Sequence, residues 1–240
     1  MGSITDTRMQ VLPLLNEVRE KLGYKTVSSL TQDAHIRTML EYLNDVIDIT
    51  SDFSDWQEMR TTVTVTASSS VYMYLVDPVS AAVKNIREVA FQDSVAPLRL
   101  DTIDNMRRWR RSASGGTGCP RYWIVNGVDN TTTGNPYIEV YPQPGAFENN
   151  KTFNILLYKK PPIYTSSDAN TYIPFPARMI ISGVLAYALL DESRGTNNVD
   201  FLTQFKAIYT PMMEEAYNRL NGDSGTDTQF VPMRRGFRRA

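Results

Sequence analysis

The segment from Arg178 to Leu190, RMIISGVLAYALL, constrains the fold more than any other part of the chain. Apolar residues occupy nearly every face of a helix here, and the small residues Gly183, Ala186 and Ala188 keep that helix thin. A helix that is apolar all round is surrounded by protein rather than laid on a surface. The apolar run of about 12 residues is shorter than the roughly 20 that span a bilayer. The segment therefore predicts a buried central helix.

The bulk composition bounds the remaining possibilities. With 240 residues, 42% of them apolar, the chain can bury one large core, or a core and a satellite domain. A net charge of -1 predicts no general attraction to nucleic acid or to an anionic membrane, so such a partner would have to meet a local patch. Cys119 is the single cysteine, which excludes an internal disulfide. The first ten residues lack the basic start and apolar stretch of a secretory signal, so we expect assembly in a cytoplasm.

Helical periodicity occurs at both ends of the chain. Near the N-terminus, VLPLLNEVREKLG repeats apolar residues at helical spacing, with Pro13 in the first turn and Gly23 as a C-terminal cap. A second amphipathic helix of about 20 residues around Ile36 to Ile49 is expected to pair with the first as an antiparallel hairpin. A last amphipathic helix covers residues 198–220, and we expect Pro211 to bend it or split it in two.

Between these helices the hydrophobic period changes to two, which is typical of strands. Thr61 to Ala67 and Val71 to Val76, separated by three serines, are predicted to form a hairpin. A short helix is expected over residues 101–110, with Asp101 as its N-cap. The stretch 126–136 is polar and rich in glycine and asparagine, which indicates an exposed turn region. Further strands are predicted at residues 83–91, 97–100, 121–125, 137–141 and 152–158.

This order of elements predicts an α+β fold. We expect a four-helix core with an inserted antiparallel β-rich domain and an extended C-terminal arm. The expected division of the chain is an N-terminal helical hairpin at 1–57, the inserted β-rich domain at 58–162, C-terminal helices completing the helical core at 163–221, and a flexible linker with a basic C-terminal arm at 222–240.

The sequence contains little that is arranged for catalysis. His35 is the single histidine, and we interpret it as a structural or surface residue; Cys119 lacks a local nucleophile signature. The glycines at 115, 116 and 118 lack the lysine and the following helix of a P-loop, which favours a flexible loop. No spacing of metal ligands is present. We therefore predict no catalytic, cofactor-binding or metal-binding residues, and no enzyme activity.

Two arginine-rich segments remain. MRRWRR, residues 106–111, places four arginines around Trp109, which could stack on bases and hold phosphates. The alternative is a helix end whose arginines complement the helix dipole and whose tryptophan covers the sheet. The second segment, FVPMRRGFRRA at 230–240, carries four arginines and no acid, so the rest of the chain has a net charge of -5. Apolar anchors among arginines favour a segment that becomes ordered on a partner surface.

The order, spacing and character of the elements resemble a known family. The helix LLNEVREKLG is followed by a helix ending in SDFSDWQEM, the strand TTVTVTA, the strand pair CPRYWIV and YIEVYPQP, the strand FNILLYKKPP and the helix IPFPARMIISGVLAYALL. This combination, over roughly residues 11–220, is similar to head-to-tail adaptor (connector) proteins of tailed bacteriophages. The resemblance implies a helical core with an inserted β-domain, in a ring that is usually dodecameric and lies between the portal and the tail or its nozzle.

The resemblance also implies partners and site residues. C-terminal segments of such proteins commonly reach onto the portal protein, which implies portal contacts by Phe230, Met233, Arg234, Arg235, Phe237, Arg238 and Arg239. A candidate secondary interface consists of Arg107, Arg108, Trp109, Arg110 and Arg111. The implied partners are the portal protein, a tail or nozzle protein, further copies of the chain, and packaged DNA that passes through the channel without sequence readout. No membrane is implied, and the expected location is the head-to-tail interface of the virion, after assembly in the host cytoplasm.

Two other functions remain open on the residues alone. A nucleic-acid-binding module would use the 106–111 and C-terminal arginines, and its binding to DNA would fall steeply with salt. A carbohydrate-binding β-domain is suggested by four aromatic residues that core packing and subunit contacts also explain, namely Tyr122, Trp123, Tyr137 and Tyr141.

Overall fold

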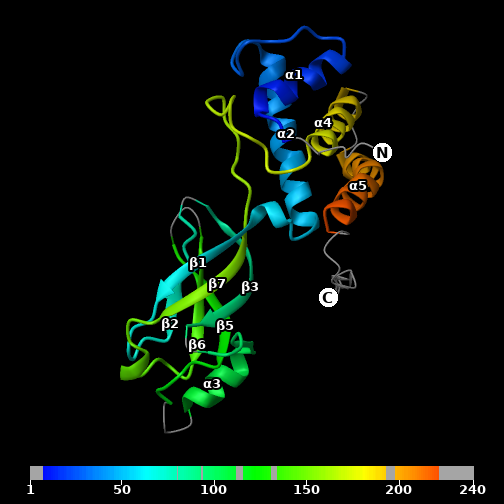
Figure 1. Ribbon diagram of the computed structural model, residues 1–240. Helices are drawn as coiled ribbons and strands as arrows, with labels where there is room; N and C mark the ends of the chain where they lie inside the picture. Colours follow the sequence, from blue (N-terminus) through cyan, green and yellow to red (C-terminus); the bar gives the residue numbers. More distant parts are fainter. Residues whose placement is uncertain are drawn as a thin grey trace.

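The computed structural model describes residues 8–79, 81–92, 94–111, 116–130, 134–192 and 198–221. Its helices are α1 (Val11–Lys21), α2 (Ala34–Phe53), α3 (Ile103–Arg111), α4 (Ala177–Glu192) and α5 (Asn198–Asn221), with 3-10 turns η1 (Gln57–Met59) and η2 (Ala146–Glu148). Its strands are β1 (Arg60–Thr66), β2 (Met73–Leu75), β3 (Val83–Phe91), β4 (Arg99–Leu100), β5 (Tyr122–Val128), β6 (Pro136–Tyr141) and β7 (Thr152–Lys159). The molecule is elongated, with α1, α2, α4 and α5 at one end and the strands with α3 at the other (Figure 1). The predicted α+β class is confirmed.

Helix α4 lies at the centre of the helical part, as its all-round apolar sequence predicts. It packs against α1, α2 and α5. Gly183 permits a close approach, because a Cβ at this position would lie 2.7 Å from both the Val46 side chain on α2 and the Tyr209 ring on α5. Beside this contact the hydroxyl groups of Thr50 and Tyr209 are 2.8 Å apart. Residues from these four helices form one buried hydrophobic cluster.

The pairing and continuity of the helices differ from expectation in two ways. Helix α2 contacts α1, but its main partner is α4, so the first two helices are not chiefly a hairpin. Helix α5 continues through Pro211 as one helix, so of the two expected effects of this proline, a bend or a split, the split is wrong. Tyr209 and Met213, on either side of the proline, are both buried in the helical cluster. Tertiary packing on both sides therefore offsets the lost backbone hydrogen bond.

Two sheets form the β-rich part. The first has the strand order β1-β7-β3, and the second has the order β2-β6-β5-β4. Strand β1 pairs with β7 and β2 pairs with β6, so the predicted hairpin between residues 61–67 and 71–76 is wrong. The serine-rich stretch 68–70 connects the two sheets instead of closing a tight turn within one. Their inner faces enclose a second hydrophobic cluster that includes Phe91, Trp123 and Phe153.

Strand β5 produces two further differences. It pairs in parallel with β4, through Arg99 opposite Tyr122, so the strands are not all antiparallel. It also extends to Val128 with an irregular register after Val125, so part of the stretch that was expected to be an exposed turn is strand. Residues 131–133 of that stretch lie outside the described residues.

The helical and β-rich parts are joined at the end of α2. Trp56 is buried there, and its indole nitrogen donates to the Thr50 carbonyl at 2.7 Å. Its ring forms a T-shaped pair with the Phe175 ring, with the ring centroids 5.5 Å apart. Lys84 of β3 pairs with Asp55 at 3.4 Å and donates to carbonyl groups at the C-terminal end of α2. These contacts fix the β-rich part against the helical part.

Candidate functional site

The arginine-rich segment of the sequence forms α3, which lies between β4 and β5 in the chain. The Thr102 hydroxyl accepts a hydrogen bond from the backbone N–H of Asn105 at 3.3 Å, so Thr102 caps the helix and the predicted cap, Asp101, is wrong. Asp101 lies one residue further out, where its carboxylate accepts from the Asn105 side-chain amide at 2.7 Å. Met106 is buried and anchors the helix. Figure 1 shows α3 at the end of the molecule away from α1 and α4.

Trp109 covers the second sheet. Its ring lies 4.5 Å from the Tyr122 ring on β5 and 5.2 Å from the Tyr141 ring on β6, and it stacks on the latter at an interplanar angle of 26°. These contacts agree with the interpretation in which the tryptophan covers the sheet rather than stacking on bases. Two of the four aromatic residues suggested for carbohydrate binding, Tyr122 and Tyr141, thus contact Trp109, and a third, Trp123, is buried in the core.

Arg110 is engaged in a buried polar network that sequence reasoning missed. Its guanidinium group lies 2.5 Å from Glu139 of β6 and 3.7 Å from the centre of the Tyr72 ring. Glu139 is only 2% exposed, and the Asn126 side-chain amide donates to its other carboxylate oxygen at 2.5 Å. A buried carboxylate needs such partners, because desolvation of an unpaired charge is costly. The signal in the sequence was an acid between Ile138 and Val140 in a predicted strand.

The remaining arginines of α3 face solvent. Arg107, Arg108 and Arg111 are exposed, and no ion pair links them to another residue in the part of the chain that the structure describes. Two further exposed arginines lie nearby: the backbone N–H of Arg99 on β4 donates to the carbonyl of Arg121 at 2.8 Å. Together they give the α3 end of the molecule a positive surface, which we call the α3 surface.

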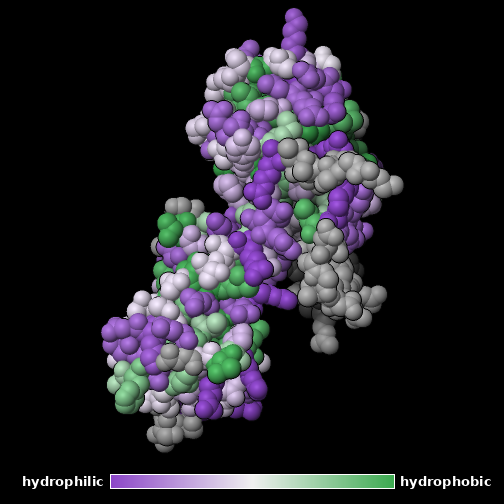
Figure 2. Space-filling model, in the orientation of Figure 1, coloured by the Kyte–Doolittle hydropathy of each residue, from purple (hydrophilic) through white to green (hydrophobic). Residues whose placement is uncertain are grey.

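Exposed apolar side chains accompany these arginines. Leu100 at the end of β4 and Ile103 at the start of α3 are 68% and 45% exposed. On the face shown in Figure 2, hydrophobic residues are scattered in small areas among hydrophilic ones. Apolar and aromatic anchors among arginines are typical of protein–protein interfaces. The α3 surface thus has the composition of a docking surface rather than of a deep pocket.

The predicted portal contacts cannot be placed on this geometry. Residues 230, 233–235 and 237–239 lie outside the described residues, as does the preceding linker. The last described element is α5, which ends at Asn221. The structure therefore brings Arg107, Arg108 and Arg111 together on one surface and leaves the C-terminal segment as a prediction.

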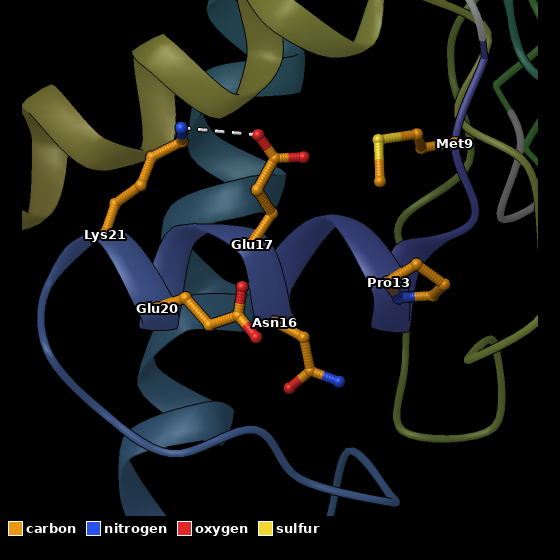
Figure 3. Close-up of a pocket in the computed structure, with 6 residues that line it drawn as sticks. All are labelled: Met9, Pro13, Asn16, Glu17, Glu20 and Lys21. Carbon is orange, nitrogen blue, oxygen red and sulfur yellow. Dashed lines mark ion pairs between the residues drawn. The ribbon is translucent and has the colours of Figure 1, made fainter.

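A hollow lies beside α1 (Figure 3). It has a volume of about 620 Å³ and is lined by side chains that include Met9, Asn16, Glu17 and Lys21. Glu17 pairs with Lys21 at 3.4 Å, one helical turn away. Asn16 exchanges two hydrogen bonds with the backbone of Val27, both at 2.9 Å. The polar groups of Asn16, Glu17 and Lys21 therefore serve the local structure.

The single histidine has structural surroundings. The His35 ring contacts the Tyr24 ring at a tilt of 36°, with the ring centroids 4.0 Å apart. Its Nδ1 atom lies 3.0 Å from the guanidinium of Arg19, which pairs with Asp33. Within the described ranges, no three His, Cys, Asp or Glu residues gather as metal ligands. None of the helices seen there is long and apolar enough to cross a bilayer.

Comparison with known proteins identifies the family. A search of the curated proteins finds no match to the chain. The family model for the SU10 adaptor protein matches residues 9–236, which is nearly the whole chain and includes both hydrophobic clusters and the C-terminal arginines up to Arg235. The resemblance to head-to-tail adaptors of tailed phages is thereby confirmed. The chain belongs to the SU10 adaptor protein family and is a phage adaptor, a structural component of the virion.

Proposed function

We propose that this chain is a structural head-to-tail adaptor that forms a dodecameric ring between the portal and the tail. In this proposal the ring docks onto the portal through its C-terminal arm, gives the tail its attachment surface and lets packaged DNA pass through its channel without reading the sequence. The observation that carries the proposal is the family match over residues 9–236. An elongated molecule with helices at one end and a β-rich part at the other also suits a protein that joins two partners (Figure 1).

The portal contact is assigned to Phe230, Met233, Arg234, Arg235, Phe237, Arg238 and Arg239. The chain leaves the helical part at Asn221, and residues 222–240 follow. Residues 230–240 carry four arginines and no acid, which suits binding to an acidic surface. Their two phenylalanines can fill apolar pockets. Twelve arms acting together multiply a weak contact into a stable joint.

The tail contact is assigned to the α3 surface. Arg107, Arg108 and Arg111 supply charge-assisted hydrogen bonds, while Leu100 and Ile103 supply apolar contact. Trp109 and Arg110 hold α3 on the sheet, and we assign them no direct role in docking. This restricts the secondary interface predicted from the sequence to three of its five residues.

We further propose that residues 1–57, 58–162, 163–221 and 222–240 act as the four units predicted from the sequence. The two separate hydrophobic clusters support a helical unit built from both ends of the chain and a β-rich unit between them. The chain passes between them twice, where η1 meets β1 and after β7 ends at Lys159.

Mixing the purified protein with its purified portal tests the proposal. Light scattering should show portal particles that gain the mass of a ring, and removal of residues 222–240 should abolish that gain. Charge reversal of Arg234, Arg235, Arg238 and Arg239 in the full-length chain should weaken binding, while reversal of Arg107 and Arg108 should leave it unchanged. Portal binding that is indifferent to the C-terminal residues would contradict the assignment.

A nucleic-acid-binding role is the second candidate, favoured by the exposure of Arg107, Arg108 and Arg111. It predicts DNA affinity that falls with salt by roughly one unit of log-log slope for each phosphate contact. Substitution of these three arginines by glutamine should then lower both the affinity and the slope. If the substitutions leave DNA affinity unchanged, the role is excluded for this surface.

A further inference from the structure

A groove between α2 and α5 combines an apolar floor with an acidic edge. Its volume is about 280 Å³, and its lining includes Asp48, Ile49, Asp52 and Phe53 from α2 with Thr210 and Met213 from α5. Ile49 and Phe53 are half-buried, whereas Asp48 and Asp52 are exposed. No ion pair within the described part of the chain neutralises either carboxylate.

The acidic edge continues along α2. Glu41, Asp45, Asp48 and Asp52 follow one another at spacings of four, three and four residues, so they share the exposed side of the helix. Lys206 of α5 is the cation that lines the groove opposite them. The acids outnumber it, so the groove suits a segment that carries several positive charges and a few apolar side chains.

We propose that this groove binds the C-terminal segment of the same subunit, residues 230–240, when no portal is present. The segment has the matching composition: Arg234, Arg235, Arg238 and Arg239 can pair with the α2 carboxylates. Phe230, Val231, Met233 and Phe237 can cover the apolar floor. Guanidinium groups bind carboxylates through two parallel hydrogen bonds, which fixes orientation as well as charge.

The chain is long enough for this contact within one subunit. From Thr210 to Asn221 the helix rises by about 16 Å, at 1.5 Å per residue. Residues 222–229 can span about 26–29 Å when extended. The linker can therefore turn back beside α5 and deliver the segment to the groove. Attachment to the same chain also gives the segment a millimolar effective concentration, which favours its own groove over that of another copy.

The groove and the portal would compete for the same arginines. This consequence rests on the proposed portal contact, whereas the docking itself does not. The segment would leave the groove on the portal, which would offer it more contacts than the groove does. In a free subunit the groove would keep the basic arm covered. Testing the docking without portal separates the failure of this inference from a failure of the portal assignment.

Thiol accessibility in the full-length protein measures the docking. In a Cys119→Ser background, Thr210→Cys places one thiol in the groove and keeps both acids. Ser182→Cys is the matched control, because Ser182 lines the hollow on the other side of α5, between α4 and α5. Reversal of the four arginines to glutamate should accelerate labelling of the groove cysteine by N-ethylmaleimide at least threefold and leave the control rate unchanged.

Four further outcomes decide the inference. Salt at 1 M, where charges are screened within about 3 Å, should have the same accelerating effect as the arginine reversal. Introducing Asp48→Arg and Asp52→Arg into the arginine-reversed chain should restore slow labelling, which a structural effect of the arginines alone would not do. The proposal would be overturned if neither arginine reversal nor salt changed the labelling rate of the groove cysteine. If that cysteine were labelled more slowly at higher protein concentration, the groove would instead bind the arm of a second copy.

Discussion

Replacement of Arg110 by alanine separates a structural arginine from the docking arginines of α3. The substitution removes the guanidinium group that lies 2.5 Å from Glu139, a residue that is 2% exposed. Removal of one partner of a fully buried ion pair costs about 3–5 kcal/mol, because the other charge stays buried. The Arg110 side chain is 36% exposed, so water can partly replace it. We therefore expect a loss of about 2–3 kcal/mol in the unfolding free energy of the β-rich part.

The neighbouring arginines supply matched controls. Arg107→Ala and Arg108→Ala remove exposed side chains from the same helix and should change stability by no more than about 0.5 kcal/mol. A second control combines Arg110→Ala with Glu139→Gln, which should recover part of the loss because an amide can be buried at lower cost than a carboxylate.

A urea titration followed by hydrogen exchange of peptides from β5 and β6 provides the measurement, since these peptides report on the β-rich part alone. The reasoning would be refuted if Arg110→Ala matched Arg107→Ala within 0.5 kcal/mol, or if the added Glu139→Gln change made the loss larger.

Three other predictions concern the helical part, and urea unfolding followed by circular dichroism checks each. Gly183→Ala should destabilise the protein by about 1–2 kcal/mol, because the added Cβ would lie 2.7 Å from the Tyr209 ring. This overpacking outweighs the gain of about 1 kcal/mol in helix propensity, and a gain in stability would contradict the prediction. Thr50→Val should cost about 1 kcal/mol by removing a hydrogen-bond partner of the buried Tyr209 hydroxyl, and Thr50→Ser should cost less. The backbone N–H of Ile36 lowers the pKa of Asp33 below 3.8, so the stability contributed by this carboxylate is present above about pH 4 and is lost as the pH falls through the lower folded pKa. Asp33→Asn should weaken that acid dependence, and an unchanged dependence would refute the assignment.

Sequence patterns correctly predicted the elements that depend on residues close together in the chain. Helix α4 followed from a run that is apolar on all faces, and Gly183 took the role expected of a small residue in a crowded helix. Strands β6 and β7 were predicted close to their observed bounds because alternating residues and the prolines that follow them mark their ends. Strand pairing was not local: β1 pairs with β7, about 90 residues away, while the nearby serines imitate a hairpin turn.

The candidate site was partly predictable, because its arginines are close together in the chain whereas their partners on the sheet are not. The arginine cluster is visible in the sequence, but the sequence does not show which arginine faces the sheet. That choice depends on Glu139 and Tyr72, which reach Arg110 only through the folded sheet. The alternative in which Trp109 covers the sheet could be stated beforehand, and only its ring contacts with Tyr122 and Tyr141 decide for it.

Electron microscopy of the full-length chain bound to its purified portal tests the central claim most directly. The account predicts a ring of adaptor subunits on the portal, with density for the C-terminal arginines and phenylalanines on the portal surface and α3 pointing away from it. A bound ring whose C-terminal residues contact only their own subunit, or a mixture in which no ring forms, would contradict the account.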